Sequence, residues 1–133
     1  MDKIKSVEEL EVFKRAHQVT LETYKISKEF PADEKFGLTS QMRRAAASIA
    51  TNLIEGGYRL NRAEYRQFVG IARGSSGELK YHILLAKDLG YLSKSDYDVL
   101  KSELDEISKM LIGLAKSLAP RKDLHVYSHL NSH

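Results

Sequence analysis

The sequence predicts an all-α fold, an antiparallel up-down-up-down bundle of four long helices. Apolar residues recur at alternating spacings of three and four over four long segments, the pattern of amphipathic helices. The 133 residues include only eight glycines and two prolines, too few turn residues for an all-β sandwich. The breaks between the segments are about 4 to 9 residues long, which makes neighbouring helices antiparallel. We expect one domain, with the bundle over residues 1–119 and a mobile tail over 120–133.

The first helix is expected over residues 6–29. Ser6 and Glu9 have the spacing of a capping box, with serine at the N-cap and glutamate three residues later. Pro31 ends the helix, because the residue before a proline is pushed out of the α region. The predicted core stripe is Val12, Ala16, Val19, Thr23, Ile26 and Phe30, widened by Leu10, Phe13, Leu21 and Tyr24.

The second helix is expected over residues 38–55, with Thr39 as its N-cap. Gly56 and Gly57 are expected to end it, because glycine is common just after the last helical residue. Alanines on its apolar face let a neighbouring helix come close. That face is Leu38, Met42, Ala45, Ala46, Ile49 and Leu53.

The third helix is expected over residues 61–89. Asn61 and Glu64 have the spacing of a capped helix start, and Leu60 and Tyr65 occupy the positions of a hydrophobic staple. Gly90 is expected to cap the C-terminal end. The predicted apolar face is Tyr65, Phe68, Val69, Ala72, Leu79, Ile83 and Ala86.

The fourth helix is expected over residues 95–118, starting near Ser93 or Ser95 and ending before Pro120. Its apolar residues follow a strict 3,4,3,4 spacing, which is the heptad seam of a bundle or coiled coil. They are Tyr97, Leu100, Leu104, Ile107, Leu111, Leu114 and Leu118.

Three glycines lie in the third helix, where each costs about 1 kcal/mol relative to alanine. Gly70, Gly74 and Gly77 are spaced i, i+4, i+7 and therefore share one face. We expect this face to allow close helix packing, either within the bundle or between subunits. The alternative is that the glycines clear space for a ligand such as a phosphate backbone.

A polar ridge runs along the second helix and includes Gln41 and Ser48. If the ridge packs against the third helix, ion pairs between its charges and that helix keep half-buried charges paired. The expected pairs are Arg44 with Glu78, or Arg73 with Glu55. We therefore expect a structural polar network of Arg44, Asn52, Glu55, Arg73 and Glu78, with a solvated face as the alternative.

The net charge of +3 is unevenly distributed. Six of the eight arginines lie between residues 43 and 73, which points to an anionic partner; the alternative is an arginine-rich helix with internal ion pairs. Arginine binds phosphate with a bidentate fork, and a helix start favours anions. The residues expected to bind nucleic acid are Arg43, Arg59, Arg62 and Arg66, with Tyr58 placed to stack on bases.

Composition and motifs argue against several classes of function. The absence of cysteine excludes disulfides, thiolate nucleophiles and cysteine-ligated zinc. No stretch approaches ~20 apolar residues and no signal peptide is present, so we expect a cytoplasmic protein without a membrane partner. No catalytic motif is found, and we expect no enzymatic activity, cofactor or metal. His125, His129 and His133 lie in the tail, with no cysteine or well-placed carboxylate to complete a metal site.

Several ordered motifs resemble one protein family over roughly residues 8–119. The family's phenylalanine–proline turn is followed by glycine-leucine-threonine-serine-glutamine, an arginine pair, serine-isoleucine and asparagine-x-x-glutamate-glycine. A later block reads alanine-arginine-glycine-serine and then glutamate-leucine. In this chain the motifs are Phe30-Pro31, residues 37–41, Arg43-Arg44, Ser48-Ile49, residues 52–56, residues 72–75 and Glu78-Leu79. One departure is Tyr58, which stands between Gly57 and Arg59.

These motifs are similar to those of bacterial proteins first found as reading frames inside intervening sequences of 23S rRNA genes. The resemblance implies a long antiparallel four-helix bundle that assembles into a ring, typically a homopentamer. It implies no known enzymatic activity. Related proteins serve as accessory subunits of diversity-generating retroelements, where basic pentameric rings engage a reverse transcriptase and nucleic acid.

Two functional hypotheses follow. The first is a non-enzymatic oligomer that binds RNA or DNA through its arginine-rich surface without base specificity. The alternative is a protein-interaction scaffold or accessory subunit, with a polymerase-type protein as partner and no direct nucleic-acid contact. The salt dependence of nucleic-acid binding distinguishes them, because phosphate contacts release counterions.

Overall fold

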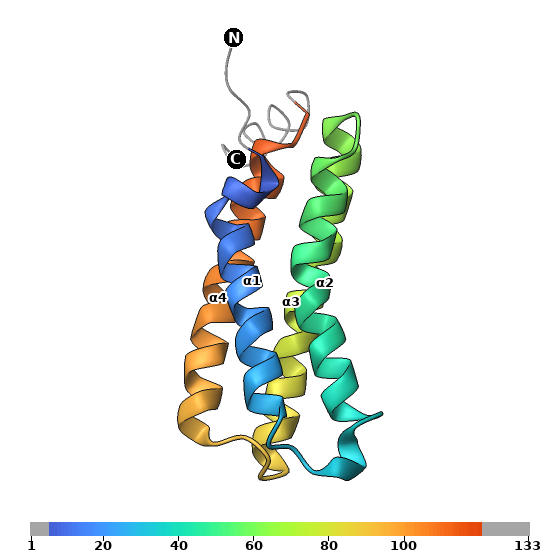
Figure 1. Cartoon of the computed structure of the whole chain (residues 1–133). Helices are drawn as coiled ribbons and strands as arrows, with labels where there is room; N and C mark the ends of the chain where they lie inside the picture. The colour runs from blue at the N-terminus through green and yellow to red at the C-terminus, as the bar shows by residue number, and fades with distance from the viewer. Residues whose placement is uncertain (1–5, 121–133) are drawn as a thin grey trace.

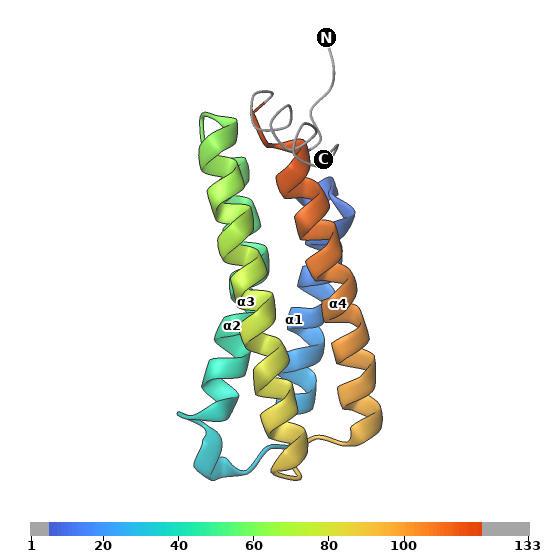
Figure 2. The same ribbon diagram turned by 180° about the vertical axis from the view of Figure 1, so that it is seen from behind.

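The computed structural model describes residues 6–120 as a bundle of four helices. Successive helices lie side by side and run in opposite directions (Figures 1 and 2), which confirms the predicted all-α bundle. Residues 121–133 of the expected tail lie outside the described part. None of the helices in residues 6–120 is long and apolar enough to cross a membrane. The elements in order are η1 (Val7–Glu9), α1 (Glu11–Ser27), η2 (Ala32–Glu34), α2 (Leu38–Gly57), α3 (Arg62–Asp88) and α4 (Lys94–Ser117).

The core runs along the bundle where the predicted apolar stripes meet. α2 packs most extensively against α3, α3 also packs against α4, and α1 lies against α2 and α4. Burial of these stripes is the main favourable contribution to folding. Leu21 and Tyr24 of α1 are exceptions, because about half of each is exposed. The largest fully buried aliphatic and methionine side chains are Met42, Ile49, Leu53, Leu79, Ile83, Leu104, Ile107 and Leu111.

The chain enters the first helix later than predicted. The Glu9 carboxylate accepts hydrogen bonds from the Ser6 N–H at 3.4 Å and from its hydroxyl at 3.0 Å, but the turn that they close is η1. Leu10 then has an extended backbone (φ −69°, ψ 137°), so α1 begins at Glu11. The extra turn folds against α2 and buries Val7.

The start of α2 is also set differently from the prediction. Thr39 is inside the helix, and Gly37 is the residue that precedes it. The Glu34 carboxylate reaches across the connection and accepts a hydrogen bond from the Leu38 N–H at 3.1 Å. A side chain of the preceding turn therefore satisfies one of the free N–H groups at the start of α2, and Thr39 is not the N-cap.

The end of α2 lies two residues beyond the prediction, because Gly56 and Gly57 continue the helix. A β-carbon at Gly56 would lie 2.8 Å from Tyr65 Cδ1 and 2.9 Å from Phe68 Cβ. Such distances leave no room for a side chain. Gly56 therefore allows α3 to approach α2 closely instead of ending the helix.

The caps of α3 and α4 agree with the sequence. The Asn61 side chain accepts a hydrogen bond from the Glu64 N–H at 2.9 Å, and α3 spans Arg62–Asp88. Gly90 follows with a φ of +83°, a conformation that suits glycine. The Ser93 hydroxyl accepts from the Asp96 N–H at 3.1 Å and caps α4.

Candidate nucleic-acid interface

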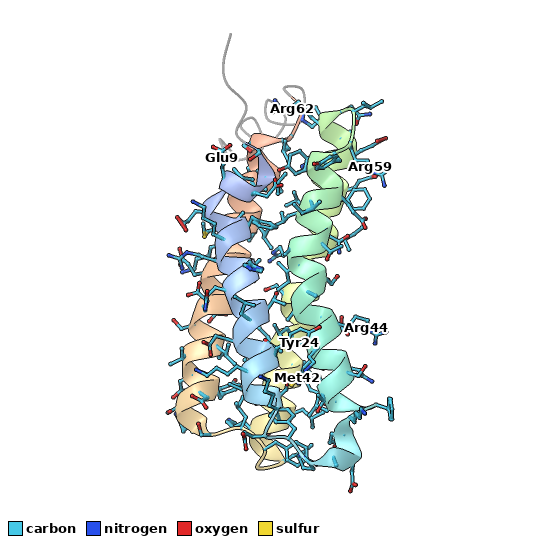
Figure 3. The ribbon with its side chains drawn as sticks, in the orientation of Figure 1. Glu9, Tyr24, Met42, Arg44, Arg59 and Arg62 are labelled. Atoms are coloured by element: carbon cyan, nitrogen blue, oxygen red, sulfur yellow. The ribbon has the colours of Figure 1, made fainter. Side chains whose placement is uncertain are left out.

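Four of the five predicted interface residues lie at one end of the bundle, around the α2–α3 corner (residues 58–62). Figure 3 shows Arg59 and Arg62 at this end. Tyr58 belongs to the same corner, and Arg66 follows one turn into α3. Arg43 is one turn into α2, roughly 24 Å away along the helix at 1.5 Å per residue. The structure therefore separates Arg43 from the other four.

Arg43 forms hydrogen bonds with the C-terminal end of α1. Its Nε donates to the Ser27 hydroxyl at 2.8 Å, and its Nη2 donates to the Tyr24 carbonyl at 3.4 Å. The guanidinium also stacks 4.8 Å from the centre of the Tyr24 ring. A cation is favourable here, because the last carbonyls of a helix have no partner within it and carry partial negative charge.

Arg62 and Arg66 bind the C-terminal end of α4 in the same way, by donating hydrogen bonds to its last carbonyls. Arg62 Nη2 donates to the Ser117 carbonyl, and Arg66 Nε donates to the Ala115 carbonyl at 3.0 Å. These contacts hold the start of α3 against the end of α4. Each guanidinium has five N–H donors, so both residues keep donors beyond these bonds. Arg62 is exposed, whereas Arg66 is half-buried.

Of the four arginines predicted to bind nucleic acid, Arg59 has the fewest side-chain bonds within residues 6–120. Within residues 6–120 its side chain forms no hydrogen bond or ion pair, and its guanidinium lies 4.6 Å from the centre of the Phe68 ring. The neighbouring Tyr58 is 76% exposed. Leu60 is fully exposed, so it does not form the predicted staple with Tyr65. The corner thus presents an arginine, a tyrosine and a leucine to solvent.

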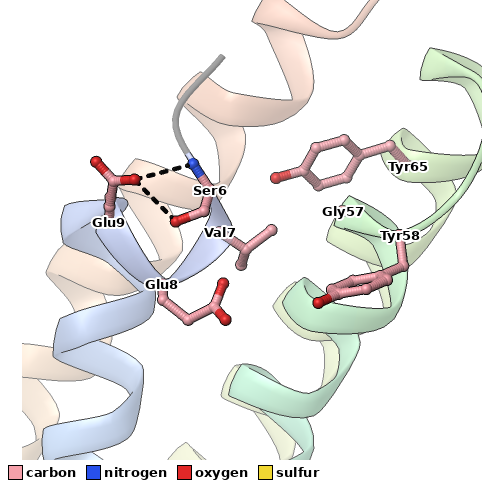
Figure 4. A pocket seen from close by; sticks show the side chains of 7 residues that line it. All are labelled: Ser6, Val7, Glu8, Glu9, Gly57, Tyr58 and Tyr65. Atoms are coloured by element: carbon pink, nitrogen blue, oxygen red, sulfur yellow. Dashed lines mark hydrogen bonds between the residues drawn. The ribbon is translucent and has the colours of Figure 1, made fainter. Parts of the chain in front are cut away.

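An open pocket of about 410 Å³ lies beside the corner, between η1 and the end of α2 (Figure 4). Its lining residues are Ser6, Val7, Glu8, Glu9, Gly57, Tyr58 and Tyr65. Gly57 is essential to its shape, because a β-carbon there would collide with the Val7 side chain. The pocket has no signature in the sequence, since it joins residues about 50 positions apart.

The polar network predicted between α2 and α3 is built differently from the expectation. Neither the Arg44–Glu78 nor the Arg73–Glu55 ion pair forms among residues 6–120. Both arginines are exposed. Ser48 lies opposite Ser75 and Gly56 lies opposite Tyr65, so Glu55 is level with the start of α3 and more than a turn from Arg73.

Small polar side chains join α2 and α3 instead. The Ser48 and Ser75 hydroxyls are 2.8 Å apart, and Asn52 Nδ2 donates to the Ser48 hydroxyl at 2.9 Å and to its carbonyl at 2.8 Å. Ser76 and Ser108 form a similar hydroxyl pair at 3.0 Å between α3 and α4. Of the predicted network, Asn52 therefore contributes through its bonds to Ser48 within α2, and Ser48 makes the hydrogen bond to α3.

His82 is a buried polar residue of α3. It is 5% exposed, and its Nδ1 has no hydrogen-bond partner in the described part of the chain. Its Nε2 is 3.8 Å from a Glu78 carboxylate oxygen. Burial lowers the pKa of His82, Arg44 lowers it further, and Glu78 acts in the opposite direction. His82 is therefore neutral at neutral pH.

Gly70, Gly74 and Gly77 do not pack within the bundle. All three are exposed, and a β-carbon at any of them would meet no atom of residues 6–120 within 4 Å. Packing within the bundle, one of the two expected forms of close packing, is therefore wrong for these residues, and packing between subunits stays a prediction. The helical period explains why the glycines are exposed, because Gly70 lies about 180° around α3 from the buried Leu79. We call these three residues the glycine face.

Metal binding has no support among residues 6–120, which contain no group of three histidine, aspartate or glutamate side chains placed to hold an ion. The histidines of the tail, His125, His129 and His133, lie outside the described residues.

Comparisons with known proteins agree with the fold. The family model described as "23S rRNA-intervening sequence protein" matches residues 8–113. A crystal structure of a protein of unknown function from the S23 ribosomal protein family of Bacteroides thetaiotaomicron superposes with a TM-score of 0.71. The two sequences are 23% identical, and the match covers 79% of this chain and 98% of that chain. At this identity the likeness shows the fold alone. A comparison with curated proteins finds no match.

Proposed function

The chain belongs to the 23S rRNA-intervening sequence protein family, and from this premise we propose that it is a non-enzymatic oligomer that binds nucleic acid at the α2–α3 corner. The family description names no enzymatic activity, and the Bacteroides thetaiotaomicron protein is described as one of unknown function. The proposed contact is to RNA or DNA phosphate.

The exposed corner is the observation that carries this proposal. Arg59 has a guanidinium without a hydrogen-bonding partner in residues 6–120, and Arg62 keeps donors beyond its bond to α4. Both lie at the start of α3, where the first N–H groups of the helix also favour anions. Tyr58 adds an exposed ring on which a base can stack. Arg43 is left out, because it lies at the other end of the bundle and holds α1.

The proposal of an oligomer is supported by the glycine face. A 27-residue helix that carries three exposed glycines loses about 1 kcal/mol at each relative to alanine, and no contact with residues 6–120 offsets this loss. Tyr81, on the same side of α3, is 59% exposed, and Ile71, about a quarter of a turn around the helix, is 51% exposed. A helix of a second copy packed on this face would cover them. A ring, as the family resemblance implies, would repeat the arginine corner in every subunit and strengthen phosphate binding.

The test is fluorescence anisotropy with labelled structured RNA and DNA across a range of salt concentrations. Binding through phosphates falls steeply with salt. Arg59→Glu should weaken it without affecting the fold, because the Arg59 side chain forms no hydrogen bond or ion pair within residues 6–120. Arg62 and Arg66 are unsuitable as first variants, since they also hold α4. Lys28→Glu is the matched control, with the same change of charge on an exposed residue at the opposite end.

A protein-interaction scaffold is the alternative function, with a polymerase-type protein as partner. Leu60 favours it, because a fully exposed leucine at the corner suits an apolar contact with a protein. Absence of nucleic-acid binding at about 50 mM salt would refute the nucleic-acid proposal for the isolated protein and favour this alternative. Analytical ultracentrifugation tests the oligomer separately, and a monomer at all concentrations would refute that part.

A further inference from the structure

We propose that the pocket beside the corner binds one unstacked guanine base of a single-stranded nucleic acid. This inference rests on the proposed function and names its substrate class. The pocket volume of about 410 Å³ lies within the range of small-molecule sites. Sequence-specific recognition of single strands generally uses this arrangement, in which a splayed base stacks on an aromatic ring and bonds through its edges.

The two tyrosines supply the stacking wall and a hydrogen-bond donor. Tyr58 stands at the mouth of the pocket with most of its ring exposed, so a base can lie against it without displacing other side chains. The hydroxyl of Tyr65 points across the pocket toward η1 (Figure 4). Burial raises the pKa of Tyr65, so its hydroxyl keeps its proton and can donate to a base carbonyl such as guanine O6.

Glu8 supplies the groups that select the base. Figure 4 shows its carboxylate facing the pocket, whereas the Glu9 carboxylate is turned away and bonded to Ser6. A carboxylate only accepts hydrogen bonds, and its two oxygens match two parallel donors. Guanine presents two adjacent donors on its Watson–Crick edge, N1–H and the 2-amino group. Adenine and cytosine present one amino group there, and uracil and thymine present one N–H between two carbonyls.

The charges at this end of the bundle favour different positions for the base and the phosphate backbone of a bound strand. Glu8 repels phosphate from the pocket, while Arg59, next to Tyr58 in the chain, attracts it to the outer side of the corner. A strand can therefore place its phosphates on the arginines and one base in the pocket. A duplex cannot do so, because its bases are paired and stacked.

The experiment compares 12-residue oligothymidine strands that carry thymine, guanine, inosine or adenine at one central position, measured by anisotropy at low salt. We expect guanine to bind roughly tenfold more tightly than thymine, the effect of one well-made bidentate contact. Inosine, which lacks the 2-amino group, should retain about a threefold advantage. Adenine should bind close to thymine.

Glu8→Gln is the informative variant, because a glutamine side chain both donates and accepts. It should remove the preference for guanine while leaving binding of the all-thymine strand unchanged or slightly stronger. Glu11→Gln is the control, since Glu11 is exposed at the same end and does not line the pocket. It should keep the preference.

The outcomes separate the two proposals. Salt-dependent binding that Arg59→Glu weakens, but with equal affinity for guanine and thymine strands, would overturn the pocket inference and leave the proposed function standing. A guanine preference that persists in Glu8→Gln would also overturn it. Absence of binding to every strand would overturn the pocket inference, and absence of binding to the structured RNA and DNA as well would refute both.

Discussion

Alanine substitutions at Gly56 and Gly74 should have opposite effects on stability, although both glycines lie inside helices. Gly74 belongs to the glycine face, and an added β-carbon would meet no atom within 4 Å. Removing a helical glycine at such a site stabilises by about 1 kcal/mol. At Gly56 the new β-carbon would lie 2.9 Å from Phe68 Cβ, which is attached to the rigid backbone of α3.

The change in the free energy of unfolding caused by Gly56→Ala follows from two opposing effects. The same gain in helix propensity of about 1 kcal/mol applies, but overpacking a tight contact costs about 1–3 kcal/mol. We expect Gly56→Ala to be destabilising by about 1 kcal/mol, which leaves a difference of about 2 kcal/mol between the two variants.

The assay is urea unfolding followed by circular dichroism, at several protein concentrations so that assembly is separated from monomer stability. At low concentration Gly74→Ala should raise the unfolding midpoint and Gly56→Ala should lower it. If both variants are stabilised equally, the close α2–α3 contact at Gly56 is refuted. If Gly74→Ala destabilises the monomer, the glycine face is not open to solvent and an interface there loses its support.

Three further predictions concern the polar groups of the bundle. Because burial lowers the pKa of His82 in the folded protein, the unfolded chain binds its proton more tightly, so stability is retained above about pH 6.5 and falls as the pH drops below it; His82→Gln should flatten this decline in unfolding curves measured between pH 7.5 and 5.5. Arg66→Ala should cost about 1 kcal/mol by freeing a carbonyl of α4, whereas Arg73→Ala, which removes no bond within residues 6–120, should cost almost nothing in the same unfolding measurement. A double-mutant cycle with Ser48→Ala and Ser75→Ala should give a coupling energy of about 1 kcal/mol, and strict additivity would show that the hydroxyl pair does not contribute.

The sequence predicts the helices well and their ends less well. Each apolar stripe is a local pattern, readable within one segment. Helix ends depend on neighbours as well. Glu34 helps to start α2 through a hydrogen bond to Leu38, and the approach of α3 makes the chain continue as helix through Gly56.

The candidate site was predicted in residue type but not in arrangement. An arginine cluster is visible in the sequence, yet the roles of its members depend on distant partners. Arg62 and Arg66 bond to carbonyls 55 and 49 residues later in the chain. Arg43 bonds to the end of the preceding helix. Among the four predicted interface arginines, these bonds leave Arg59, with Tyr58, as the most available group, and no local pattern distinguishes it from the other three.

The four amphipathic helices and their short connections follow from the amino-acid pattern alone, because a helix with one apolar face must bury that face against other helices. Which glycines matter inside the bundle, and which face outward, depends on how the helices pack in three dimensions. Gly56 and Gly57 are close to other elements, whereas the glycine face is open. The physical reason is that spacing along a helix shows which residues share a face, while the packing of neighbouring elements decides what each face meets.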